Sequence, residues 1–216
     1  MAADEGAWEL LGAVAYGELA AFDRLAADAR LAPELPDRVQ MTQMAALQYT
    51  HFGQVRDRIE DLGGDVLAVM EPYRRPFEDF HQLTQPKTWY EGLLKAYIGD
   101  GLAADFYREV SELVDEQTRT VVHEVLAEGD FADFVVERVR DAIETDPDIA
   151  GRLALWGRRL VGEALSQAQR VAAERPALTE LFAEQSEQQP LVLISELSSR
   201  LVRNHTARMA RLGLSS

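Results

Sequence analysis

Apolar side chains recur at steps of three and four residues along most of this 216-residue chain. That spacing places them on one face of an α-helix, and no segment alternates convincingly with the period of two expected for a strand. With 47% hydrophobic residues, the chain is long enough to bury one sizeable core. The sequence therefore predicts an all-α protein.

Prolines and glycines divide this pattern into helices. Pro33 and Pro36 separate the first two helices, Gly63 and Gly64 end the second, and Gly129 marks a kink or break in the fourth. We predict core helices at about 8–30, 37–62, 88–114 and 116–145, and further helices between about 147 and 213. Residues 64–87 contain three prolines and no clear periodicity, so we expect an irregular segment packed on the body.

The lengths of the connections predict the topology. The first and second core helices are closely joined, as are the third and fourth, whereas about 24 residues (64–87) separate the two pairs. Two antiparallel hairpins joined by one long crossover form the ferritin-like four-helix bundle. We therefore expect a single ferritin-like domain over 1–216, with its core at about 8–145 and additional C-terminal helices packed on it at about 147–213.

Polar residues interrupt the apolar faces of three predicted helices. Glu18 lies in the middle of the face in the first helix, Gln48 and His51 in that of the second, and Asp100 in that of the third. An ionised carboxylate in an apolar interior costs several kcal/mol unless it is paired, protonated or bound to metal. Three helices with the same costly feature indicate a shared polar centre.

The spacing places these residues at one height in the bundle. The first turn is centred near residue 33, with Glu18 fifteen residues before it and Gln48 fifteen after it. In an antiparallel hairpin such positions face each other, about 22 Å from the turn at ~1.5 Å per residue. Asp100 likewise precedes the second junction, near residue 115, by fifteen residues, and Glu128 lies near its facing position. The predicted metal ligands are Glu18, Gln48, His51, Asp100 and Glu128.

This donor set departs from a full di-iron site. Such sites use one carboxylate from each of two helices and Glu-x-x-His from each of the other two. Here the second helix offers Gln48-x-x-His51 and the fourth offers Glu128-x-x-Phe131, with Glu124 as an alternative alignment. Glutamine is a weak neutral ligand and phenylalanine is none. Two interpretations stay open, an incomplete iron site and a metal-free buried hydrogen-bond network.

Three stretches resemble the actinobacterial ferritin-like proteins grouped with the MiaE-type tRNA hydroxylases. They are AYGELAAFDRLA (15–26), WYEGLLKAYIGDGLAADFYRE (89–109) and RLALWGRRLVGEALSQAQRV (152–171), so the resemblance spans most of the chain. It implies an iron-dependent monooxygenase that hydroxylates the isopentenyl group of a modified adenosine in tRNA. It also implies a glutamate at position 48 and a histidine near position 131, where this chain has Gln48 and Phe131.

The charge of the chain argues against a nucleic-acid partner. A polyanion such as tRNA requires a basic surface, and the net charge here is −15. The best local patch is the C-terminal group Arg200, Arg203, Arg208 and Arg211, which is also typical of a solvated helix face. A small-molecule substrate and a metal-free interaction protein therefore stay open as alternatives to the tRNA hydroxylase, and a homodimer is compatible with the sequence.

The location of the protein is predicted from what its composition excludes. There is no cysteine, which excludes disulfides and thiolate-bound metals and fits a reducing compartment. The sequence contains no apolar run long enough for a membrane span, and its first residues are acidic, unlike a signal peptide. We expect a cytoplasmic protein with no membrane partner.

Overall fold

A computed structural model describes residues 2–127, 131–175 and 190–216. Within these ranges the chain forms helices and no strand, which confirms the all-α prediction. The helices are α1 (Ala2–Asp28), α2 (Leu35–Asp61), α3 (Val66–Leu83), α4 (Trp89–Ser111), α5 (Glu116–Val125), α6 (Phe131–Thr145), α7 (Ile149–Glu174) and α9 (Pro190–Arg211). A short 3-10 turn, Ala29–Leu31, follows α1.

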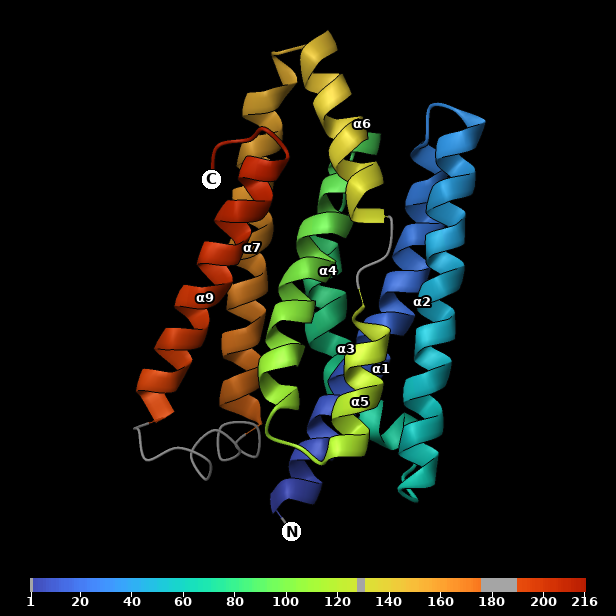
Figure 1. The fold of residues 1–216 in the computed structure, drawn as a ribbon, viewed down its shortest axis with the longest axis vertical. Coiled ribbons are helices and arrows are strands. Elements are labelled where there is room, and N and C mark those ends of the chain that lie inside the picture. Colours follow the sequence, from blue (N-terminus) through green and yellow to red (C-terminus); the bar gives the residue numbers. More distant parts are fainter. Residues whose placement is uncertain (1, 128–130, 176–189) are drawn as a thin grey trace.

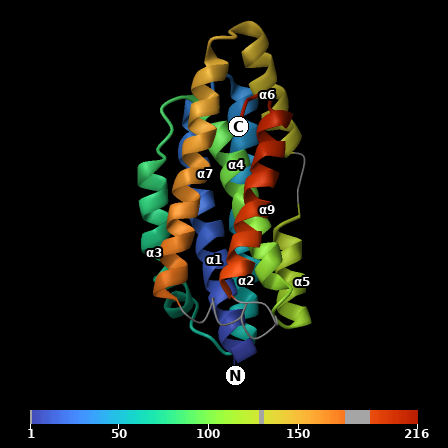
Figure 2. The same cartoon turned by 90° about the vertical axis from the view of Figure 1, so that its left-hand side faces the viewer.

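The helices run roughly along one long axis and form the predicted pair of hairpins (Figure 1). Helix α1 packs along α2 over much of their length, and α4 packs against both α5 and α6. Helix α3 crosses between the hairpins and packs on α1 and α7, while α7 and α9 cover α4 from the other side (Figure 2). The ferritin-like bundle with additional C-terminal helices is thereby confirmed.

The crossover differs from the prediction, because residues 66–83 form a continuous helix rather than an irregular segment. Pro72 and Pro76 lie inside α3, and each removes one backbone hydrogen bond. The helix persists because its apolar residues keep the helical spacing through Met70, Tyr73, Phe77 and Phe80, and they pack inward on the bundle. Tertiary burial outweighs the local cost of the prolines.

The fourth predicted core helix, 116–145, for which a kink or break was expected, forms two helices. It is divided into α5, which ends at Val125, and α6, which begins at Phe131. The predicted break at Gly129 lies outside the described residues. Helix α7 begins at Ile149, two residues later than expected, because the Asp146 carboxylate accepts a hydrogen bond from the backbone N–H of Asp148 in a short turn (3.2 Å).

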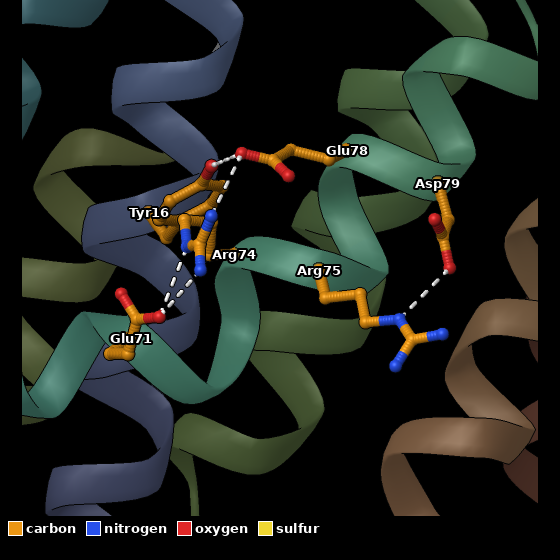
Figure 3. A network of polar contacts seen from close by, with 6 residues as sticks. All are labelled: Tyr16, Glu71, Arg74, Arg75, Glu78 and Asp79. Atoms are coloured by element: carbon orange, nitrogen blue, oxygen red, sulfur yellow. Dashed lines mark hydrogen bonds and ion pairs between the residues drawn. The ribbon is translucent and has the colours of Figure 1, made fainter.

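The polar contacts in Figure 3 join α3 to α1 at one point and link other residues within α3. The Tyr16 hydroxyl of α1 donates to Glu78 (3.4 Å), and burial together with Glu78 raises the pKa of Tyr16 to about 12. Arg74 donates to Glu71 within α3 (2.8 Å). Exposed pairs of this kind contribute less than about 1 kcal/mol each, so the packing of Met70, Tyr73 and Phe77 holds α3 on the bundle more than these contacts do.

The apolar core consists of two clusters, one towards each end of the bundle. One surrounds Leu25, Met41 and Leu93 and extends onto α7 and α9. The other lies around Leu11 and Ile59, with α3 and α5. The middle of α1, α2 and α4, where the predicted polar centre lies, falls between the two clusters.

Close packing of α1 on α3 generates a prediction. A Cβ at Gly12 would overlap the backbone carbonyl oxygen of Val69, whereas a Cβ at Gly53 of α2 meets nothing within 4 Å. We expect Gly12→Ala to destabilise the protein by about 1–3 kcal/mol through overpacking. The matched substitution Gly53→Ala should stabilise it by about 0.5–1 kcal/mol, because glycine weakens a helix. Denaturant unfolding measures both, and equal effects would contradict this packing.

Candidate functional site: a pocket inside the bundle

A cavity of about 390 Å³ lies where the two apolar clusters are separated. Helices α1 to α4 form most of its wall, and the end of α5, the start of α6 and Arg208 of α9 complete it. Apolar side chains form most of the lining, among them Met44, Leu47, Phe77, Phe80 and Phe131. A smaller group of charged and polar side chains completes it.

The facing helices α1 and α2 bring Glu18 and His51 together. Glu18 Oε2 lies 3.5 Å from His51 Nδ1, and only 9% of the Glu18 side chain is exposed. Burial raises the pKa of the Glu18 carboxyl, and the nearby Asp100 raises it further, while His51 opposes the shift. Glu18 is therefore easier to protonate than a surface glutamate.

Asp100 lines the same pocket from α4, but its charge already has a partner. Arg24 of α1 donates to its Oδ1 at 2.9 Å. Burial among protein atoms raises the pKa of the Asp100 carboxyl, and the Arg24 guanidinium opposes the shift. Only 7% of the Arg24 side chain is exposed, against 39% of the Asp100 side chain, so the ion pair forms part of the cavity wall.

The remaining predicted residues are distributed as follows. Gln48 and Phe131 line the pocket, Gln48 from α2 and Phe131 from the start of α6. Glu128 lies outside the described residues. Glu124, the alternative, is exposed on α5 and does not line the pocket. The structure thus brings Glu18, Gln48, His51 and Asp100 onto one cavity.

The sequence analysis did not identify the cations of this pocket, Arg24 and Lys95, or the imidazole of His81. Lys95 is 2% exposed and lies in the middle of the apolar run LLKAYI of α4. A lysine within such a run, in a chain with only one other lysine, was the available signal. His81 could not be assigned to the pocket from the sequence, because its segment was expected to be irregular and forms α3. Burial, with smaller effects of Lys95 and Arg24, lowers its pKa to about 2, so it is neutral.

Four buried polar atoms of the pocket make no hydrogen bond among the described residues. Arg24 Nη1 and His81 Nδ1 have no hydrogen-bond partner, and Glu18 Oε2 and His51 Nδ1 meet only each other, at 3.5 Å. An unsatisfied buried group costs about 1–3 kcal/mol. Both donors and acceptors are in this set, so the pocket suits a guest that can both accept and donate hydrogen bonds.

These residues do not fit a di-iron centre. The described chain contains no group of three histidine or acidic side chains placed to hold one ion. Asp100 is paired with Arg24, and Lys95 adds a second cation to the same lining. Two ferrous ions would bring four positive charges next to these cations, where the low dielectric strengthens repulsion. The donor chemistry therefore favours a metal-free interior.

The C-terminal arginines do not form a free basic patch. Arg200 donates to Glu109 (2.9 Å), Arg208 lies 2.8 Å from Asp105, and Arg211 pairs with Asp133. Asp105 and Glu109 lie on α4 and Asp133 lies on α6, so the pairs attach α9 to these two helices. Arg203 remains as an exposed member of the group.

None of the helices in the described part of the chain is long and apolar enough to cross a membrane.

Comparisons with known proteins agree with the fold. No curated protein shows a matching sequence. The family described as "Ferritin-like domain, actinomycetes" matches residues 2–185, which is most of the chain. The chain therefore belongs to the ferritin-like domain family of actinomycetes.

Proposed function

We propose that this protein binds a small, mostly apolar molecule with a neutral polar head group inside its bundle, without a metal ion. The observation that carries the proposal is the cavity of about 390 Å³ between the two apolar clusters. Sites for small molecules commonly measure about 300–1,000 Å³, with largely apolar walls and a few placed polar groups. This pocket has both features.

The charges of the pocket support a neutral head group. Arg24 and Asp100 balance each other as an ion pair, and burial shifts both Glu18 and Lys95 towards their neutral forms. Arg208, which also lines the pocket, is paired with Asp105. The net charge of a charged ligand would be left uncompensated, whereas a hydroxyl, amide or carbonyl can satisfy the unpartnered donors and acceptors.

An iron-dependent hydroxylase of the MiaE type is the second candidate. The contact between Glu18 and His51 favours it, because a carboxylate and an imidazole from facing helices are ligands of such enzymes. The Arg24–Asp100 ion pair argues against it, since the acid is not free to bind metal. The net charge of −15 and the paired C-terminal arginines argue against a tRNA substrate.

Filling the pocket tests the binding proposal. Gly99 of α4 lines the pocket, and a Cβ placed there meets nothing within 4 Å. We expect Gly99→Leu to weaken binding of the neutral probe 3-phenylpropan-1-ol at least about tenfold, because a pocket occupied by a side chain excludes a guest. Isothermal titration calorimetry measures the affinity, and thermal unfolding reports the fold.

Gly162 offers a matched control. It is exposed on α7, and a Cβ there also meets nothing within 4 Å. Both substitutions replace a helical glycine, so each should leave the melting temperature unchanged or raised. Gly162→Leu should bind the probe like the unmodified protein. Unmodified protein that binds no probe, or equal binding by the Gly99→Leu variant, would contradict the proposal.

Metal content tests the second candidate. We expect the protein purified from an iron-supplied culture to hold less than one iron per chain. Gln48→Glu with Phe131→His rebuilds both Glu-x-x-His pairs, with Glu128 as the second carboxylate. Adding Arg24→Gln releases Asp100 and removes a repelling cation, so the triple variant should bind more iron than the double variant. Anaerobic titration with ferrous iron, followed by elemental analysis, measures both.

The unmodified protein is the decisive sample in this series. Two tightly held irons per chain in it would show that the Arg24–Asp100 pair opens to bind metal. The hydroxylase would then replace the metal-free binding protein as the better proposal.

A further inference from the structure

Lys95 is the most unusual charged residue of the pocket. Its side chain is 2% exposed, yet it lines the cavity. In the described part of the chain its ammonium has no ion-pair or hydrogen-bond partner. Its Nζ lies over the ring of Phe80, 5.6 Å from the ring centroid. Burial of an unpaired ammonium is costly, and a lysine in this position favours its neutral amine.

The surroundings of Lys95 also favour its neutral amine. Burial, with the help of the Arg24 guanidinium, lowers the pKa of Lys95 to about 7, although Asp28 and Asp100 oppose the shift. His81 of α3 also faces it and is neutral. The neutral fraction of Lys95 at pH 7 is therefore far larger than that of an ordinary lysine, for which it is about four in ten thousand.

We propose that Lys95 captures an aldehyde or ketone ligand of this pocket as an imine. The inference rests on the proposed binding function, and it names the chemical class of the ligand. A desolvated lysine in an apolar pocket is the usual arrangement for such a nucleophile. The apolar walls would hold the body of the carbonyl compound, and Lys95 would react with its head group.

The reaction is balanced without another reactant. The lone pair of the neutral Nζ attacks the carbonyl carbon, and the C=O double bond opens to give a carbinolamine. The carbon–oxygen bond then breaks, and the oxygen leaves as water with the two hydrogens that the amine nitrogen loses. A C=N bond remains, and the water-poor pocket disfavours its hydrolysis.

The chain offers an internal control, because it contains only one other lysine. Lys87 is exposed at the end of the crossover, before α4. The full-length protein is incubated at pH 7 with 3-phenylpropanal and sodium cyanoborohydride, and peptides are analysed by mass spectrometry. We expect Lys95 to gain the mass of the aldehyde less one oxygen atom, at least about ten times faster than Lys87, in line with its larger neutral fraction.

Variants separate this inference from the binding function. Lys95→Met should lose the adduct. Binding of 3-phenylpropan-1-ol by the unmodified protein reports the binding function separately, because an alcohol cannot form an imine. Lys87→Met should leave the Lys95 adduct unchanged, and Gly99→Leu should abolish it while Lys87 reacts as before. The alcohol should slow the reaction at Lys95 by competition.

Each result has one interpretation. If the alcohol binds and Lys95 gains no more adduct than Lys87, imine capture is wrong and the binding function stands. If the alcohol does not bind and Lys95 is unmodified, both proposals are wrong. If Lys95 reacts equally in the Gly99→Leu variant, its reactivity is independent of the pocket, and the proposed ligand class is wrong.

Discussion

Charge buried halfway along the bundle is the constraint on which the rest of the structure depends. Arg24 and Asp100 form an ion pair between α1 and α4, and Glu18 contacts His51 between α1 and α2. Charged groups in an interior must be balanced locally, because the cost of desolvation is several kcal/mol for each ion. The three helices are therefore held in one register, and the apolar core is split into a cluster on each side of the polar layer.

The pocket follows from this arrangement and from the small residues around it. Gly17, Ala21, Ala96, Gly99 and Ala104 line the cavity and leave space beside the charged groups. An apolar cluster would close such a space to native packing density. Here the unsatisfied donors and acceptors make the space suitable for a guest, and the proposed binding function rests on this feature.

Helices α7 and α9 give α4 an unusual position in the bundle. Gly157 of α7 allows Met209 of α9 to approach closely, since a Cβ there would lie 2.6 Å from the methionine sulfur. Arg208 reaches Asp105 in the same layer (2.8 Å). Helix α4 is consequently buried on several sides, so a buried lysine can lie on it far from solvent.

The sequence by itself determined the helical class, the two hairpins and the common height of Glu18, Gln48, His51 and Asp100. The helical spacing and the fixed rise per residue are local properties, and they need no knowledge of neighbouring helices. The tertiary structure alone decided that residues 66–83 form a helix, because packing of Tyr73 and Phe77 outweighs two prolines. It alone also decided the charges of the site. Arg24 reaches Asp100 from another helix and Lys95 lines the same pocket, and no sequence spacing shows which opposite charges meet once the helices pack.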